Sequence, residues 1–197
     1  MMKTFTVAKA ASKGIVMGKA FVAVQEDLTA DTRSIKDSER EMEWLKFQKA
    51  VKDAVEDLRV LAKDSDIFAA HLDVAEDTVL HDSVELKINS ENKNAQLALE
   101  ETVAEIVTMF ESLDDEYLRE RAADIKDVSR RLLVNLLGKP LPNPALIDEE
   151  VVIIADDLTP SDTAQLNKNL VRGFATNIGG RTSHSAIMAR SLEIPAV

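Results

Sequence analysis

The sequence predicts an α/β domain that is interrupted by an inserted, antiparallel bundle of four helices. Short apolar runs of strand length occur near both ends of the chain. Between them, apolar residues recur every three or four positions, the spacing of one face of a helix. Glycine and three prolines then separate this helical stretch from the last part of the chain. We therefore expect one domain formed by residues 1–32 and 139–197, and a helical domain formed by residues 33–138.

The N-terminal segment contains two candidate strands, residues 4–7 and 18–24, separated by a turn region. Two strands are too few to form a stable sheet of their own. We therefore expect these strands to join strands from the C-terminal part of the chain.

Four helices are expected in the middle of the chain. Ser38 and Glu41 have the spacing of a capping box near the start of the first helix. Gly138, followed by Pro140, ends the last one, because glycine adopts the left-handed cap and proline cannot extend the helix. A helix with one apolar stripe must bury it, so the four helices are expected to pack together as a bundle. They cover residues 34–61, 67–86, 99–113 and 118–136.

The C-terminal part alternates strands with helices. Residues 151–154 are a continuous apolar run, which is typical of a strand buried on both faces. Thr159 to Asp162 have the residue types of a helix start: a hydroxyl cap, a proline in the first turn and an acid. A strand over 170–176, a pair of glycines and a helix over 185–192 follow. This order indicates an α/β unit.

The composition excludes several classes of function. A net charge of −11 argues against nucleic acid or an anionic membrane as the main partner and favours a protein with a basic surface. The absence of cysteine excludes disulfides, thiolate zinc sites and a cysteine nucleophile. No apolar run approaches the roughly 20 residues of a membrane helix, and the first residues do not resemble a secretory signal. We expect a cytoplasmic protein.

A short loop rich in glycine and hydroxyl groups precedes the last helix. Its glycines allow successive backbone N–H groups to converge, its hydroxyl residues can cap the helix, and its arginine adds a positive charge. Such an arrangement favours an anion, above all a phosphate. The loop consists of Gly179, Gly180, Arg181, Thr182 and Ser183.

His184 follows this loop directly. A neutral imidazole is a nucleophile, and an ordinary histidine is largely uncharged at neutral pH. His184 is therefore a candidate to accept a phosphoryl group. Spacing alone leaves a second interpretation open, in which His184 and its neighbours only cap the helix.

The stretch GGRTSHSAIMARSLEIPAV, with IADDLTPSDTAQL before it, closely resembles the phosphohistidine region of enzyme I of the phosphoenolpyruvate-dependent sugar phosphotransferase system. Residues 112–133 and 14–21 resemble the fourth helix and the N-terminal strands of the same family. The resemblance implies a swivelling phosphohistidine α/β domain and an inserted helical domain that binds the carrier protein HPr. Related swivelling domains of pyruvate phosphate dikinase and phosphoenolpyruvate synthase share the GG-x-T-S-H core, and they are an alternative.

The resemblance also implies roles for single residues. His184 would be phosphorylated by phosphoenolpyruvate on Nε2 and would pass the group to a histidine of HPr. Thr163 would orient the imidazole, and residues 179–183 would surround it. His71 and Arg121 would lie at the face that binds HPr. Asp73 departs from the family's pattern at this face.

In that family, a C-terminal barrel binds phosphoenolpyruvate and Mg²⁺ and forms the homodimer. The sequence stops at Val197, so we expect a monomeric fragment without a metal or cofactor of its own and without activity on phosphoenolpyruvate alone. A different alternative is a protein-interaction module in which the helical bundle binds a basic partner and the glycine loop is only structural.

Overall fold

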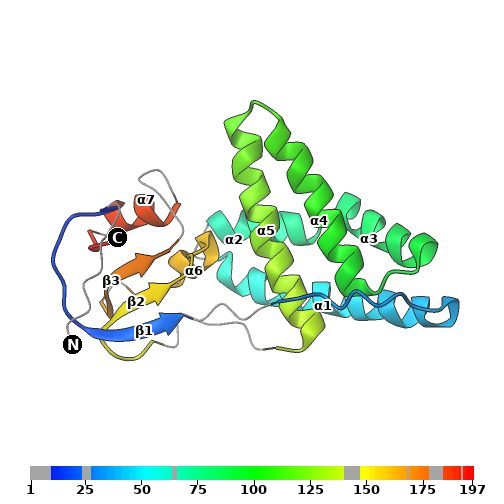
Figure 1. Cartoon of the computed structure of the whole chain (residues 1–197), viewed down its shortest axis with the longest axis horizontal. Helices are drawn as coiled ribbons and strands as arrows, with labels where there is room; N and C mark the ends of the chain where they lie inside the picture. The colour runs from blue at the N-terminus through cyan, green and yellow to red at the C-terminus, as the bar shows by residue number, and fades with distance from the viewer. Residues whose placement is uncertain are drawn as a thin grey trace, which may run out of the picture. The chain divides into compact units, whose positions relative to one another are not determined.

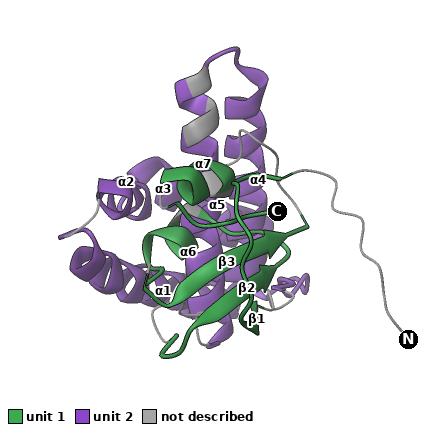
Figure 2. Cartoon of the chain, turned by 90° about the vertical axis from the view of Figure 1, so that its left-hand side faces the viewer, with its two compact units in different colours: residues 1–26, 142–197 green, residues 27–141 purple. Residues whose placement is uncertain are grey.

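The computed structural model describes residues 10–23, 28–63, 66–139, 147–167, 169–177, 184–191 and 193–197. The chain divides into two compact units, which Figure 2 distinguishes by colour. Unit 1 consists of residues 1–26 and 142–197, and unit 2 of residues 27–141. In the sequence, unit 2 thus comes between the two segments that form unit 1.

Unit 1 contains a parallel sheet with the strand order β1-β2-β3 (Figure 1). The strands are β1 (Lys19–Ala23), β2 (Val151–Ala155) and β3 (Val171–Thr176). Phe21 of β1 is in register with Ile153 of β2, which is in register with Phe174 of β3. The expectation that an N-terminal strand joins the C-terminal ones is therefore confirmed. The other expected strand, residues 4–7, lies outside the described residues.

One face of this sheet carries the core of unit 1. Ile153 and Phe174 are buried there with Ala189 and with Leu166. Side chains alternate between the two faces of a strand, and Ile154, on the opposite face, is 39% exposed. The prediction that residues 151–154 are buried on both faces is therefore wrong for the face of Ile154.

Two short helices follow β2 and β3. They are α6 (Pro160–Ala164) and α7 (His184–Ser191). The predicted start of α6 is confirmed: the backbone N–H of Asp162 donates to Oγ1 of Thr159, and the backbone N–H of Thr159 donates to Oδ2 of Asp162, both at 3.1 Å. Helix α7 begins one residue before the predicted position.

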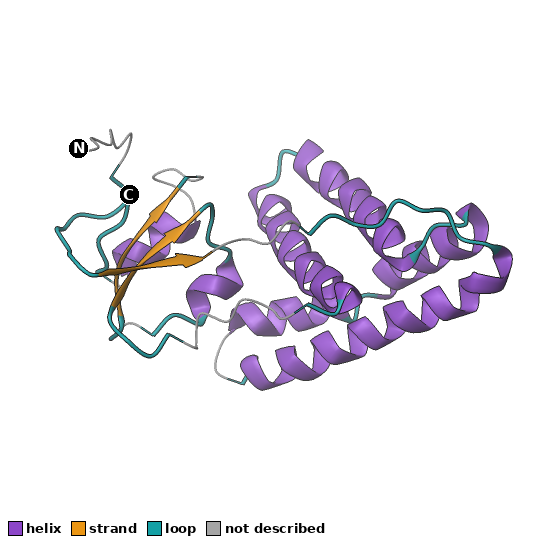
Figure 3. Ribbon diagram, turned by 60° about the horizontal axis from the view of Figure 1, so that its bottom comes forward, coloured by secondary structure: helices purple, strands orange, loops and turns teal. Residues whose placement is uncertain are grey.

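Unit 2 consists mainly of helices (Figure 3). Large apolar side chains from four of them, including Phe47, Ile88, Leu99 and Leu132, are completely buried. No helix in the part of the chain that the structure describes is long and apolar enough to span a bilayer. The α-helices are α1 (Arg40–Leu61), α2 (Asp66–Ala75), α3 (Thr78–Glu91), α4 (Ala95–Ser112) and α5 (Glu116–Leu137).

The helix predicted over residues 67–86 is in fact two helices, so the described part of unit 2 has five α-helices instead of four. Asp77 separates them. Its backbone is extended, and its carboxylate accepts hydrogen bonds from the backbone N–H groups of Val79 at 2.7 Å and Leu80 at 3.2 Å. These bonds satisfy donors that a helix start leaves unpaired, so the chain begins a new helix there.

The two other predicted helix signals had different outcomes. The capping box of Ser38 and Glu41 is wrong: a 3₁₀ turn, η1 (Asp37–Glu39), precedes α1, and the backbone N–H of Lys36 donates to the Glu39 carboxylate at 2.8 Å. The predicted stop at Gly138 is confirmed, because this glycine caps α5 in the left-handed conformation, with φ of 64°.

Candidate functional site

The carboxyl edge of the parallel sheet is the first candidate site. Strands β2 and β3 run in the same direction, so both end at this edge. Strand β2 leads into α6, strand β3 leads through residues 177–183 to α7, and the two helices contact each other. Open α/β sheets bind their ligands at the carboxyl ends of the strands. The backbone thus places His184, the first residue of α7, in the segment that follows β3 beyond this edge.

The side chains that follow the two strands are bonded to each other. Asn177 Nδ2 donates to Asp156 Oδ1 at 2.9 Å, and the Asn177 backbone N–H donates to the Ala155 carbonyl at 3.3 Å. This pair ties the ends of β2 and β3 together directly before the loop that leads to His184. Sequence reasoning missed the pair. Its only signal is that Asn177 directly follows an expected strand and that Asp156 comes two residues after the end of another.

Thr163 lies in α6 and is 2% exposed. Its hydroxyl donates to the Thr159 carbonyl at 3.2 Å, which fixes the orientation of the side chain. A hydroxyl that donates its one hydrogen still accepts through its lone pairs. Thr163 therefore presents a fixed acceptor inside unit 1.

The other predicted residues of this site are only partly described. The backbone of His184 is the first residue of α7, and its side chain lies outside the description. The predicted loop of Gly179, Gly180, Arg181, Thr182 and Ser183 also lies outside the described residues.

A cleft of about 380 Å³ in unit 2 is the second candidate site. Residues from α2, α3, α4 and α5 line it, and most of them are apolar. Val79, Met109 and Tyr117 belong to this lining and are exposed to solvent. Asp73, Asp77 and Arg121 add charge. An apolar surface with a few charged groups is suited to contact with another protein.

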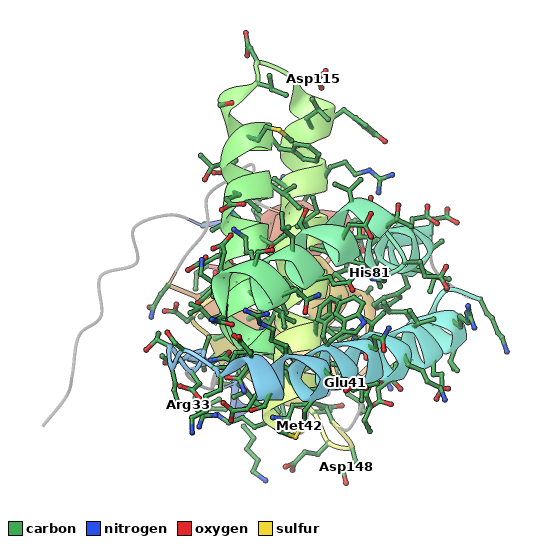
Figure 4. The ribbon with its side chains drawn as sticks, turned by 90° about the vertical axis from the view of Figure 1, so that its right-hand side faces the viewer. Arg33, Glu41, Met42, His81, Asp115 and Asp148 are labelled. Atoms are coloured by element: carbon green, nitrogen blue, oxygen red, sulfur yellow. The ribbon has the colours of Figure 1, made fainter. Side chains whose placement is uncertain are left out.

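Arg121 is held in place at this cleft by two neighbours on α5. Its Nε donates to the Tyr117 hydroxyl at 3.2 Å, and its guanidinium carbon lies 5.7 Å from the centroid of the Tyr117 ring. Tyr117 is in the first turn of α5, after the N-cap Asp115 that Figure 4 labels. One guanidinium nitrogen of Arg121 lies 3.9 Å from Asp124 Oδ2. The hydrogen bond with Tyr117 is the largest cause that raises the pKa of Arg121.

His71 does not line the cleft. It lies on α2, is 1% exposed, and packs its ring edge-on against Phe68 at 5.9 Å between centroids. The resemblance placed His71 at the face that binds the carrier, and this burial leaves the side chain without direct access to a partner. Nε2 of His71 lies 3.4 Å from Asp124 Oδ1, without the geometry of a hydrogen bond. The structure therefore brings His71 and Arg121 to the same carboxylate, which sequence reasoning missed.

Within the described residues, no three histidine, aspartate or glutamate side chains converge in a way that could hold a metal ion.

Two family models match the chain. "PEP-utilising enzyme, N-terminal" matches residues 7–121, and "PEP-utilising enzyme, mobile domain" matches residues 147–197. Among curated proteins, the phosphoenolpyruvate-protein phosphotransferase of Bacillus subtilis is 53% identical over 196 residues, and that of Staphylococcus aureus is 51% identical over 197. Each alignment covers 95% of this chain and 34% of the relative. The chain thus spans about a third of the length of these relatives.

Solved structures give the same result. An NMR structure of Enzyme I is 46% identical, with a TM-score of 0.84, over 95% of this chain and 79% of that one. The N-terminal domain of "Enzyme 1 - Nitrogen" is 23% identical with a TM-score of 0.64, which shows a shared fold. The family predicted from the residues around His184 is therefore confirmed: the chain belongs to the PEP-utilising enzymes and, within them, to Enzyme I.

Proposed function

We propose that this chain is the part of a phosphoenolpyruvate-protein phosphotransferase that carries a phosphoryl group on His184 and exchanges it with HPr in bacterial sugar uptake. One observation carries the proposal: α7 begins at His184, beyond the carboxyl edge of a parallel sheet and within the segment that matches the mobile domain. In this proposal, residues 1–32 and 139–197 form the swivelling phosphohistidine domain. Residues 33–138 form the inserted helical domain that binds HPr, and the protein acts in the cytoplasm.

The proposed reaction has two steps. In the first, the lone pair on Nε2 of His184 attacks the phosphorus of phosphoenolpyruvate. A P–N bond forms, the P–O bond to the enol oxygen breaks, and the enolate takes up a proton to become pyruvate. In the second step, a histidine nitrogen of HPr attacks the same phosphorus, and the P–N bond to His184 breaks. The backbone N–H groups of residues 179–183 and of the start of α7 would stabilise the negative charge of the phosphoryl group.

Thr163 has a specific part in this proposal. Its hydroxyl donates to the Thr159 carbonyl, so it can accept a hydrogen bond from an N–H of the imidazole. A ring whose one nitrogen is held as N–H keeps the lone pair on the other nitrogen. Thr163 would thus select the tautomer of His184 that can act as a nucleophile at Nε2.

HPr would dock at the cleft of unit 2. The exposed apolar side chains Val79, Met109 and Tyr117 would supply the buried area of the interface. Asp73 and Asp77 would face the partly basic surface that the family resemblance implies for HPr. Arg121, held by Tyr117, would bind an acceptor on the carrier without losing much side-chain freedom.

The roles proposed for phosphoenolpyruvate and Mg²⁺ come from the family resemblance. The resemblance assigns both, and dimerisation, to a C-terminal barrel. We propose that this chain accepts a phosphoryl group from phosphorylated HPr. The alternatives, a dikinase or synthase domain and a purely structural interaction module, gain no support from the relatives described above, which are phosphoenolpyruvate-protein phosphotransferases.

The test is phosphoryl transfer from HPr labelled with ³²P. The folded chain should take up one label that is stable in base and labile in acid, and His184→Ala should take up none. Phosphoenolpyruvate with Mg²⁺, in the absence of other proteins, should give no label. A folded wild-type chain that takes no label from HPr, or a labelled His184→Ala chain, would refute the proposal.

A further inference from the structure

We infer that His71 is a positioning residue that acts through Asp124 to hold Arg121 at the rim of the cleft. This inference rests on the proposed function of the cleft as the HPr docking site. Because His71 is buried, it cannot contact the carrier directly, and its role is to position another residue.

Three side chains form a path from the interior of unit 2 to its surface. The His71 side chain is 1% exposed, that of Asp124 is 22% exposed and that of Arg121 is 30% exposed. Asp124 Oδ1 lies 3.4 Å from His71 Nε2, and Asp124 Oδ2 lies 3.9 Å from a guanidinium nitrogen of Arg121. His71 comes from α2, whereas Asp124 and Arg121 come from α5. The path therefore connects two helices that line the cleft.

Asp124 is the central group of this path, because each of its oxygens faces one of the other side chains. The buried nitrogen of His71 has no hydrogen-bond partner in the described structure. In the tautomer that carries its hydrogen on Nε2, this atom is a buried donor without an acceptor, which is costly and favours any position of Asp124 that brings a carboxylate oxygen close to it. The ring thus restricts Asp124, and Asp124 restricts Arg121.

Without the imidazole, Arg121 would depend mainly on its neighbour Tyr117 for restraint. Tyr117 is itself exposed, and interactions between exposed side chains restrict them weakly. A docking arginine that moves freely must lose that freedom when the carrier binds, which lowers the affinity. The alternative is that His71 only fills the core beside Phe68, in which case Arg121 would not respond to its replacement.

The experiment compares His71→Leu, which removes the polar atoms, with His71→Gln, whose side-chain amide keeps an N–H group that can face Asp124. The first readout is the NMR signal of the Arg121 Nε–H group in the free chain. In His71→Leu this signal should move toward that of a solvent-exposed arginine and show faster internal motion. His71→Gln should restore it, and the signal of Arg59, which pairs with Glu76 at 2.7 Å, should stay unchanged in both.

The second readout is the dissociation constant for HPr. We expect His71→Leu to weaken binding about three- to tenfold, as for other coupled neighbours, and His71→Gln to stay within about twofold of wild type. The double variant His71→Leu/Arg121→Met should bind no more weakly than Arg121→Met. The matched control is His81→Gln, because this histidine contacts the Ala75 carbonyl instead of Asp124.

The outcomes separate the inference from the function on which it rests. If the folded wild-type chain does not bind HPr, the proposed docking function fails, and the Arg121 signal alone decides the inference. An unchanged Arg121 signal and unchanged HPr affinity in a folded His71→Leu chain would overturn it, as would additive losses in the double variant. If His71→Leu does not fold, Asp124→Asn replaces it, with the same loosening of Arg121 expected.

Discussion

Single residues in this chain are fixed before any ligand or partner arrives. Thr163 donates to the carbonyl of Thr159, the N-cap residue of α6, and Arg121 donates to the Tyr117 hydroxyl on α5. In both cases a residue four positions earlier in the chain restricts a side chain that the proposed function uses. Preorganisation of this kind reduces the entropy lost when the reacting or docking partner binds.

The role of Thr163 can be measured with Thr163→Val, which keeps the shape of the side chain and removes the hydroxyl. We expect phosphoryl transfer from labelled HPr to slow about two- to tenfold, the value of one neutral hydrogen bond, with little change in stability. Thr163→Ser should transfer at close to the wild-type rate. A loss as large as that of His184→Ala would show that Thr163 does more than orient the ring.

Glu43 shows how one buried residue connects two helices of unit 2. It lies on α1, and its carboxylate accepts from the backbone N–H of Ala95, the first residue of α4, at 3.0 Å. The other oxygen accepts from Lys46 at 2.6 Å. Its negative charge also lies at the positive end of α4.

Replacement of Glu43 by alanine should therefore lower the free energy of unfolding by about 1.5–3 kcal/mol, since a buried N–H group loses a charged acceptor. Urea denaturation followed by circular dichroism measures this change. Glu56→Ala is the matched control on the same helix: its side chain is exposed and lies 3.9 Å from Lys52, so the expected change is below about 0.5 kcal/mol. Equal losses in the two variants would contradict the role given to Glu43.

Among the elements, the cleft formed by α2, α3, α4 and α5 has a surface that can be tested directly. Met109 lines it and is 54% exposed. Leu45, on α1, is 57% exposed and does not belong to the cleft lining. The two residues thus have similar exposure at different places on the same unit.

Met109→Glu should weaken HPr binding at least about tenfold, because a carboxylate would have to be desolvated at the centre of the interface. Leu45→Glu should leave the affinity unchanged. Isothermal titration calorimetry gives both values, and circular dichroism shows that both variants are folded. Equal effects at the two positions would mean that HPr does not dock at this cleft.

Most elements could be predicted from the sequence because their signals are local. The cap of α6 needs only Thr159 and Asp162, and the end of α5 needs only Gly138. The break between α2 and α3 was missed because an aspartate inside an apolar period is equally compatible with the solvent face of a continuous helix. The exposure of Ile154 was missed because it depends on which segments cover the sheet.

Some features of the candidate site could likewise be predicted from local sequence, and others could not. His184 and the loop before it could be chosen from residue types in a short stretch, because phosphate binding at a helix start is local chemistry. The approach of His71 to Asp124 joins residues 53 positions apart on different helices, and no local pattern indicates it. The bond between Asn177 and Asp156 likewise depends on the pairing of two strands.

On the scale of the whole molecule, two segments separated by all of unit 2 form one sheet. β1 precedes residues 27–141 and β2 follows them, yet the two strands pair in parallel. Most buried apolar residues of unit 2 lie on its own helices, with Phe47 and Leu132 among the largest. This arrangement indicates that unit 2 has its own core.

Residues 27–141 alone should therefore fold. We expect a helical circular dichroism spectrum, a single cooperative thermal transition and HPr binding within about threefold of that of the whole chain, because the cleft lies entirely in this unit. This segment should accept no phosphoryl group, since it lacks His184. A segment that is unfolded, or that binds HPr much more weakly, would show that unit 1 contributes to the docking unit.

The most direct measurement uses the fact that the chain has three histidines. The chain is labelled with ¹⁵N in its imidazole rings, mixed with phosphorylated HPr, and observed by NMR. The account predicts that the His184 ring alone shows the nitrogen signals of phosphorylation at Nε2, while the rings of His71 and His81 remain unmodified. A phosphoryl group on either of those two rings, or three unmodified rings beside phosphorylated HPr, would contradict it.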